Sequence, residues 1–168
     1  MELIDVLTPD GAPTGVVKPK DQVHRDGDWH RSAHLWIVTP GRRLLLQRRA
    51  DQKENWPGLW DISVAGHISA GESAADAIVR EALEEVGFVP AGLEHLATLR
   101  YQAVLNGGAY IENEFHEVYL TRCELDLGTL KLDPAEVAEV KLVAPEELER
   151  HEMVPHPEEY ALIRGVLR

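Results

Sequence analysis

Residues 66–88 read GHISAGESAADAIVREALEEVGF, and this stretch decides how the rest of the chain is interpreted. Ser73 is a favourable N-cap residue, good helix formers follow it, and Gly87 stands where a helix commonly stops. The stretch therefore predicts a helix between these two residues. Four glutamates and an arginine surround that helix, in a chain whose formal net charge is already −12.

The spacing of three glutamates places them together on the predicted helix. At about 100° per residue, Glu84 lies about 60° to one side of Glu81 and Glu85 about 40° to the other. Carboxylates grouped in this way can bind Mg²⁺, which prefers oxygen ligands; the alternative is a solvated acidic face balanced by Arg80. We expect the acidic face to look outward and a neighbouring apolar face to pack, formed by Ala75, Ile78, Ala82 and Val86.

The residues around these glutamates follow a longer pattern, G-x5-E-x7-R-E-x2-E-E-x-G and then an apolar residue. The pattern resembles the Nudix box, although Ala82 stands where that family more often has Ile, Leu or Val. The resemblance implies an α/β/α sandwich around a mixed sheet, with a loop-helix-loop motif. The matching residues are Gly66, Glu72, Arg80, Glu81, Glu84, Glu85, Gly87 and Phe88.

The resemblance also implies roles for these residues. Glu81, Glu84 and Glu85 would be catalytic and, with the Gly66 carbonyl, would bind Mg²⁺ or Mn²⁺. Glu72 and Arg80 would pair to fix the loop. The usual Nudix reaction is attack of water on a diphosphate linked to another group. Glu81 is the first candidate for the general base, while the other glutamates stay open for that role.

A second group of side chains outside the box could also bind a metal. Glu112 and Glu114 are two residues apart, so both lie on one face of the predicted strand. With His24, His30 and His67 they would form a divalent-metal site of imidazoles and carboxylates. The alternative for any one of these histidines is an ordinary surface or core residue.

Residues 20–117 resemble more closely the Nudix branch that contains isopentenyl-diphosphate isomerase. In that enzyme, residues at the positions of these three histidines and two glutamates bind a metal. Arg49, Lys53 and Lys20 stand at diphosphate-binding positions, and fixed cations suit a diphosphate. The alternative for Arg48 and Arg49 is a strand end with solvated charge.

Two departures separate the chain from the isomerase. The isomerase uses a cysteine just before Gly-His, where this chain has Ala65, and a late tryptophan. All four tryptophans here precede the box, and Cys123 is expected to be a buried or edge residue. We expect Trp36 in the core, whereas Trp56 and Trp60 could line a pocket or pack a loop.

Apolar runs and turn residues predict a mixed sheet with helices packed on it. We expect one domain, residues 1–168, with a hairpin and arm in 1–30, the box in 66–88 and helices in 145–168. The predicted strands are 3–6, 14–19, 33–39, 43–49, 61–66, 93–105, 109–122 and 138–143. The last two helices are expected to open at Pro145 and near His156.

The composition excludes some classes of function and leaves others open. A net charge of −12 argues against binding nucleic acid or an anionic membrane. The first residues do not form a signal peptide, no apolar run reaches a membrane span of about 18 residues, and one cysteine excludes an internal disulfide. We expect a cytoplasmic protein; its oligomeric state is not determined by the sequence, and a homodimer is left open.

Three functions compete at this point. The first is a metal-dependent hydrolase that cleaves a diphosphate linkage in a nucleoside diphosphate joined to another group. The second is isomerase activity that uses another acid in place of the missing cysteine. The third is a binding module that holds a diphosphate ligand without turnover, although an intact set of acidic residues favours an enzyme.

Overall fold

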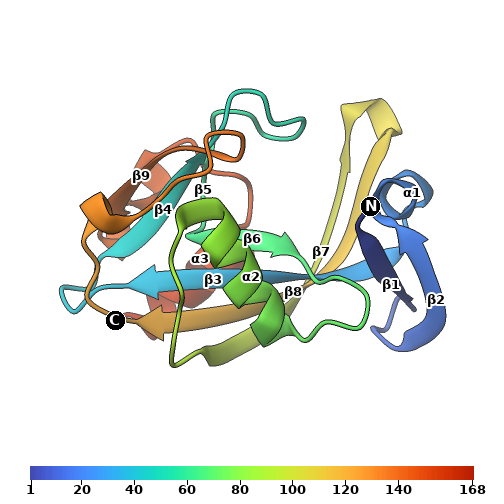
Figure 1. Ribbon diagram of the computed structural model, residues 1–168, viewed down its shortest axis with the longest axis horizontal. Helices are drawn as coiled ribbons and strands as arrows, with labels where there is room; N and C mark the ends of the chain where they lie inside the picture. Colours follow the sequence, from blue (N-terminus) through green and yellow to red (C-terminus); the bar gives the residue numbers. More distant parts are fainter.

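The computed structural model describes all 168 residues and contains one nine-stranded sheet with helices on both faces (Figure 1). The strands are β1 (Leu3–Leu7), β2 (Pro13–Pro19), β3 (Trp29–Val38), β4 (Leu44–Arg49), β5 (Trp60–Asp61), β6 (Val64–His67), β7 (Glu94–Leu105), β8 (Tyr110–Arg122) and β9 (Val137–Val143). The helices are α1 (Lys20–Asp26), α2 (Ala74–Val86) and α3 (Pro157–Val166), and short 3-10 turns occupy Asn106–Gly108, Leu127–Thr129 and Pro145–Arg150. No helix has the length and apolar character that crossing a membrane requires.

The predicted mixed sheet is confirmed, although the predicted strand 61–66 is divided into β5 and β6. β3 pairs in parallel with β8 along its whole length and antiparallel with β6 over residues 32–35. It meets β4 at only one position, Val38 opposite Leu44, and β4 then continues with β5 and β9. The two parts of the sheet therefore diverge from their shared end.

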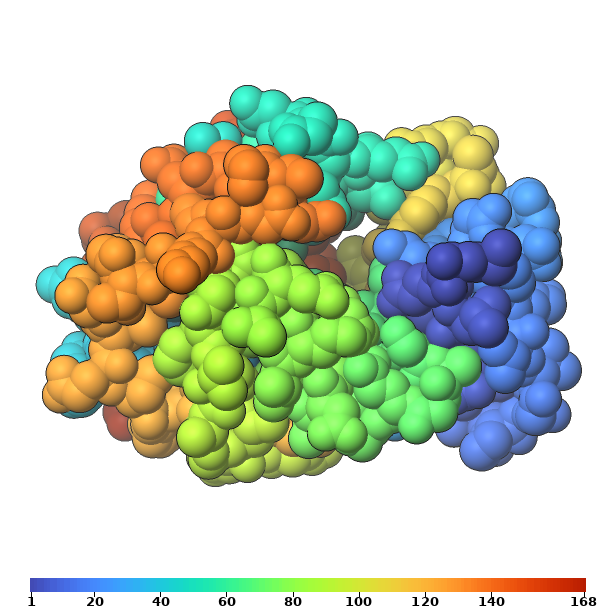
Figure 2. Space-filling view, viewed as in Figure 1, coloured from blue at the N-terminus to red at the C-terminus, as the bar shows by residue number.

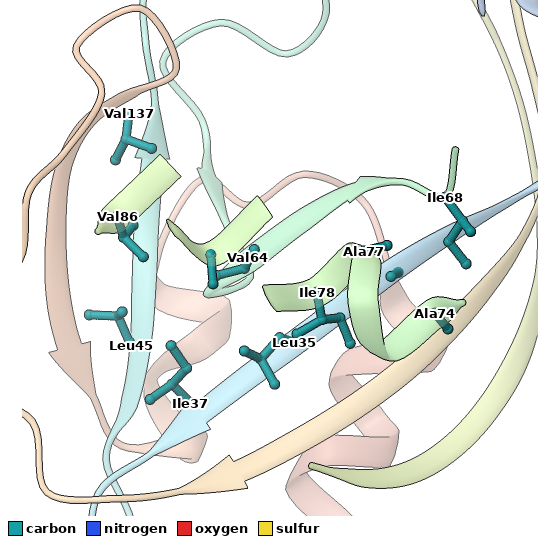
Figure 3. Packing of buried hydrophobic residues seen from close by; sticks show 12 residues of the cluster. Leu35, Ile37, Leu45, Val64, Ile68, Ala74, Ala77, Ile78, Val86 and Val137 are labelled. Atoms are coloured by element: carbon teal, nitrogen blue, oxygen red, sulfur yellow. The ribbon is translucent and has the colours of Figure 1, made fainter. Parts of the chain in front are cut away.

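Helix α2 covers one face of the sheet and has the ends that its sequence predicts. The Ser73 hydroxyl accepts a hydrogen bond from the Asp76 amide at 3.1 Å, and Gly87 closes the helix with a φ of 67°. Aliphatic side chains from β3, β4 and β6 meet the helix in a buried cluster (Figure 3). Burying this apolar surface holds α2 in place, at about 25 cal/mol per Å² removed from water.

The prediction of which α2 residues pack against the sheet was wrong for one residue, and the predicted face was too narrow. Ala75 is only half-buried, whereas Ala74 and Ala77 are buried beside Ile78. Seven residues turn an α-helix to within about 20° of the same direction, so Glu85 lies almost above Ile78. The acidic residues therefore overlap the packing face, and the expectation that they all look outward is wrong.

Two other helices differ from the expectation. Pro145–Arg150 forms a 3-10 turn and not an α-helix. The seven-residue helix α1, Lys20–Asp26, was not predicted: Pro19 at its N-cap makes no side-chain cap, and so no local signal marks its start.

Helix α3 covers the opposite face and is fastened there by Glu159. This carboxylate is 1% exposed, accepts a hydrogen bond from Trp36 Nε1 at 3.0 Å and lies 2.8 Å from His34 Nδ1. Burial alone would raise the pKa of Glu159, but the charge and hydrogen bond of His34 lower it to about 2. Burial would likewise lower the pKa of His34, and Glu159 raises it instead, so the two form a buried ion pair.

Replacing Gly87 should show how closely α2 approaches Lys131. A Cβ added at Gly87 would lie 2.8 Å from Lys131 Cβ, whereas Gly92 has a similar φ of 65° and open space around it. We expect Gly92→Ala to lower the free energy of unfolding by about 1 kcal/mol through its left-handed backbone. Gly87→Ala should lower the free energy of unfolding by roughly 1–3 kcal/mol more than Gly92→Ala does, because the added Cβ meets Lys131. Equal losses for both variants in urea denaturation would contradict this packing.

The variant Glu159→Gln should lose about 3 kcal/mol of unfolding free energy near neutral pH, because it leaves His34 buried without its partner. Glu159 contributes fully to the free energy of unfolding above its ordinary pKa of about 4.3, and this contribution is lost as the pH falls toward about 2. The contribution of His34 is full below about 6.5 and is lost as the pH rises through its raised pKa.

The difference between wild type and Glu159→Gln should therefore be largest between about pH 4.3 and about pH 6.5. Urea denaturation at about pH 3, about pH 5.5 and about pH 9 measures it. Glu158→Gln, on the exposed side of the same helix, serves as the control and should change little. A difference that is constant across these pH values would refute the ion pair.

Candidate active site

A cleft of about 480 Å³ lies where the two parts of the sheet diverge. Figure 2 shows this hollow between the N-terminal hairpin (blue), the loop after β4 (teal), the β7–β8 hairpin (yellow) and α2 (green). Most of the residues proposed for catalysis, metal binding and substrate binding line it: Lys20, Arg49, Lys53, Gly66, His67, Arg80, Glu81, Glu84, Glu85, Glu112 and Glu114. Residues from five separate stretches of sequence thus share one cleft.

Arg80 and Glu72 pair as the sequence predicts. The guanidinium donates to both carboxylate oxygens of Glu72, each at 2.9 Å, and to the carbonyl of His67 at 3.1 Å. Glu72 also accepts from the Ser69 amide at 3.0 Å, and the Arg80 hydrogen bond lowers its pKa. A two-pronged pair of this kind fixes geometry, so the loop between β6 and α2 is held against the helix.

Glu81 is pressed between Arg80 and the glycine at the end of β6. Its Oε1 accepts from Arg80 Nη1 at 2.7 Å. A Cβ added at Gly66 would lie 2.2 Å from the Glu81 carboxyl carbon, so only glycine allows this approach. Burial raises the pKa of Glu81 despite the opposing effect of Arg80.

Glu85 and Glu84 occupy different environments on the same helix. Glu85 is 6% exposed and accepts a hydrogen bond from Gln47 Nε2 at 3.0 Å. Burial, and next the charge of Glu81, raise its pKa well above the ordinary value. Glu84 points outward, with 59% of its side chain exposed, and lies 3.6 Å from Arg80 Nη1.

These carboxylates fit a divalent cation. Burial raises the pKa of both Glu81 and Glu85, and the nearby negative charges of Glu84 and Glu81 respectively raise it further. A cation between them would remove that penalty, and hard oxygen donors suit Mg²⁺ or Mn²⁺. The donor set therefore supports the metal that the box implies.

The second proposed metal group also comes together. His24 on α1, His30 on β3, His67 on β6 and Glu114 on β8 have their ligand atoms within 4.8 Å of one another. Glu114 Oε1 lies 2.8 Å from His30 Nε2 and 3.2 Å from His67 Nε2. Glu112 lines the same cleft but lies outside this group of four.

The outer nitrogens of this group support metal binding. His24 Nδ1 and His30 Nδ1 lie 2.9 Å from the carbonyls of Lys20 and Asp28, so these nitrogens carry the protons. The Nε2 atoms then face inward: those of His24 and His67 are 3.2 Å apart, and that of His30 lies 2.8 Å from Glu114 Oε1. Carbonyls that orient imidazoles in this way are typical around metal ligands.

The titration of His24 agrees with this picture, whereas Glu114 raises the pKa of His30 despite its burial. Burial, followed by the charges of His67 and His30, lowers the pKa of His24 to about 4, so it stays neutral as a ligand must. Burial and the charge of Glu114 raise the pKa of Glu112 to about 8. A bound cation would stabilise the ionised form of Glu112.

Three cationic side chains line the cleft at the positions predicted for diphosphate binding. Arg49 donates to the Asn55 carbonyl at 3.0 Å and pairs with Asp61, while Lys53 pairs with Glu136. Lys20 lies 3.6 Å from Glu2. Each cation is thus held at the cleft by an anionic or carbonyl partner.

The tryptophans and the cysteine take distinct positions. Trp36 is fully buried, as expected, and Trp56 lines the cleft. Trp60 does not line it and packs under Lys141, whose Nζ is 4.3 Å from the ring centre. Cys123 lies outside the cleft, so it cannot act there in place of the cysteine that Ala65 replaces.

Sequence reasoning missed three histidines that line the cleft: His156 before α3, and His34 and His116 on strands. A usable signal was present: residues an even number apart on a strand share a face. His34 is four residues after His30, and His116 is two residues after Glu114. His116 Nε2 lies 3.0 Å from the second oxygen of Glu114.

The chain matches the NUDIX domain family over residues 28–162. Nudix hydrolase 3 of Arabidopsis thaliana is 46% identical over 151 residues, and the match covers 87% of this chain but only 20% of that protein. Isopentenyl-diphosphate Delta-isomerase of Paenarthrobacter aurescens is 36% identical over 146 residues, which are 86% of this chain and 77% of that protein.

Solved structures show the same fold. A crystal structure from Deinococcus radiodurans has a TM-score of 0.74 at 22% identity, covering 99% of this chain and 100% of the other. The NUDIX domain of Shewanella oneidensis NrtR, complexed with ADP ribose, has a TM-score of 0.65 at 19% identity, covering 82% and 88%. The chain therefore belongs to the Nudix family, whose hydrolases act on small-molecule diphosphate substrates and generally use divalent metals.

Proposed function

We propose that this protein is a metal-dependent hydrolase that cleaves the diphosphate linkage of a nucleoside diphosphate joined to another group. One observation carries the proposal: the half-buried Glu81 and the buried Glu85 on α2 face the same cleft as three cationic side chains. The carboxylates suit a divalent cation, and the cations suit a diphosphate. The name of the Arabidopsis relative, a Nudix hydrolase, supports the same reaction class.

Glu81, Glu84 and Glu85, with the Gly66 carbonyl, would hold Mg²⁺ or Mn²⁺, and the His24, His30, His67 and Glu114 group, with Glu112 beside it, would hold a second ion. Such ions supply charge neutralisation at the phosphoryl oxygens and a lowered pKa for a nearby water. Arg49, Lys53 and Lys20 would bind the diphosphate, each in competition with its present carboxylate or carbonyl partner.

Glu81 would accept the proton of the attacking water. Its raised pKa brings it nearer to neutrality, where a carboxylate is a more effective base. The hydrogen bond from Arg80 and the contact with Gly66 fix its position. Because Glu81 is already held in position, little rearrangement is needed before it takes the proton from the water.

We also propose that residues 1–168 form one domain that works in the cytoplasm. A single cysteine and the interleaving of the N-terminal hairpin with the cleft support this, because His24 comes from residues that precede the matched family segment. A homodimer remains compatible with every contact described above.

Replacing either buried glutamate should remove activity without unfolding the protein. We expect Glu81→Gln and Glu85→Gln to lower turnover of nucleoside diphosphate derivatives by about 10²-fold or more in Mg²⁺. The free energy of unfolding of Glu85→Gln should not fall, because a raised pKa means that its ionised form destabilises the fold. The exposed Glu94→Gln is the control; turnover unchanged in both cleft variants would sink the assignment.

Isomerase activity is the alternative favoured by the isomerase relatives and by the shared metal-binding positions. It requires an acid beside the reacting double bond, and Ala65 lines the cleft at the position of the cysteine. We expect no dimethylallyl diphosphate when the protein is incubated with isopentenyl diphosphate and Mg²⁺ and followed by proton NMR. Isomerisation that survives Cys123→Ser would overturn this expectation.

A further inference from the structure

Glu2, the residue before β1, lines the same cleft as the box glutamates. Its carbonyl accepts a hydrogen bond from the Lys20 amide at 3.0 Å, and the carbonyl of the next residue, Leu3, accepts one from the Ala70 amide at 2.8 Å. Figure 2 shows these first residues (dark blue) at the rim of the hollow, beside the loop of the box (green). Backbone hydrogen bonds therefore fix the position of Glu2 at the cleft.

The two carboxylate oxygens of Glu2 have different surroundings. Oε2 lies 3.6 Å from Lys20 Nζ, which is too long for a hydrogen bond. Oε1 is buried and makes no hydrogen bond within the protein. A buried polar atom without a partner is unfavourable, and more so when it carries charge. A bound ion or molecule would supply the partner that Oε1 lacks.

The charge of Glu2 acts on the box. Burial, and then the charges of Glu84 and Glu2, raise the pKa of Glu81, so Glu2 adds to the negative charge that the cleft already concentrates. Lys20 is the cationic partner of Glu2 and is also one of the three cations placed for a diphosphate. One ammonium group cannot fully neutralise both, so Glu2 needs a second cation when a diphosphate binds.

The chemistry of the cleft decides what the partner of Oε1 is. A phosphoryl oxygen is excluded, because it and Glu2 are both anionic at neutral pH. A hydroxyl could donate to Oε1, but it would leave the charges of Glu2 and Glu81 uncompensated. A divalent cation satisfies Oε1 and compensates both carboxylates, and carboxylate oxygens are ligands that Mg²⁺ and Mn²⁺ prefer.

We infer that Glu2 is a further ligand of the cation held by the box glutamates, and that it exchanges Lys20 for this cation when the cation binds. The exchange would free Lys20 for the diphosphate. The N-terminal hairpin, which precedes the matched family segment, thus completes the metal site. The inference rests on the proposed function, since it assumes a metal at Glu81 and Glu84.

Binding of Mn²⁺ without substrate, followed by electron paramagnetic resonance of the free ion, tests this inference. Wild type is compared with Glu2→Gln, which removes the charge, and with Glu2→Asp, which keeps the charge and shortens the side chain by one methylene. Asp10→Asn, an exposed position on the turn of the same hairpin, is the matched control. Each change is also made in the Glu81→Gln protein, and thermal unfolding in EDTA verifies that every variant is folded.

We expect Glu2→Gln and Glu2→Asp each to weaken one Mn²⁺ site by about tenfold, and Asp10→Asn to leave it unchanged. In the Glu81→Gln protein the same changes at Glu2 should have little further effect, because both residues act on one ion. Full affinity in Glu2→Asp would mean that only the charge of Glu2 matters, and full affinity in both variants would leave Glu2 as a partner of Lys20 alone. Either result overturns the inference, as does an undiminished loss in the Glu81→Gln protein, which would place Glu2 at the second metal group.

The exchange of partners has a test of opposite sign. Lys20→Met removes the competitor for Glu2, so it should strengthen Mn²⁺ binding in the wild-type protein and much less in Glu2→Gln. A misfolded variant would not produce such a gain. A gain of equal size in both proteins, or no gain in either, would contradict the exchange.

Failure of this inference and failure of the proposed function give different results. Turnover of nucleoside diphosphate derivatives by wild type, with an Mn²⁺ affinity that does not depend on Glu2, keeps the hydrolase and removes Glu2 from the metal site. An Mn²⁺ affinity that depends on Glu2, without turnover by wild type, keeps the ligand and removes the hydrolase.

Discussion

Arg80 joins the segments of chain on which the cleft depends. Its guanidinium donates to Glu72 in the loop, to the His67 carbonyl at the end of β6 and to Glu81 on its own helix. Five donors in one rigid plane can serve these acceptors together, which a lysine could not do. Without this residue, the carboxylates of Glu72 and Glu81 would lose the cation that they share, and the loop would lose its hydrogen bonds to α2.

The same carboxylates explain why an acidic chain concentrates more negative charge at one place. The pKa values of Glu81 and Glu85 are raised by burial and by nearby like charge, which shows that their ionised forms are poorly accommodated as they stand. A solvated acidic face would show no such effect, because water would screen it. Only Glu84 fits that description. The crowding is therefore better explained by a cation site than by a solvated surface.

Local patterns predicted most of the elements, and long-range register explains what they missed. The caps of α2 and the alternation within β7 and β8 depend on residues that are close together in the sequence, so these elements can be predicted from it. The position of His116 beside His34 depends on the parallel pairing of β3 with β8, in which Ser32 lies opposite His116 and His34 opposite Val118. No turn fixes the register of such a pair, since parallel strands are joined by long connections.

The burial of Glu81 and Glu85 is a second feature that local sequence patterns could not predict. Their angles around α2 were predicted correctly, but the width of the packing face was not, because it depends on how far the sheet extends beneath the helix. The short helix α1 was not predicted for a different reason: it has no side-chain cap and too few residues for a periodic pattern. Residues whose placement comes from tertiary packing were therefore the ones that the sequence left undetermined.

The two ends of the cleft are built from different parts of the chain. Helix α2 supplies the carboxylates of one side, and the cations come from α1, β4 and the loop after β4, whereas β3, β8 and the residue before α3 supply His34, His116 and His156. Glu114 lies between two groups of histidines, with one oxygen near His30 and His67 and the other near His116. Because the two histidine groups share this one carboxylate, a change at Glu114 would disturb both of them.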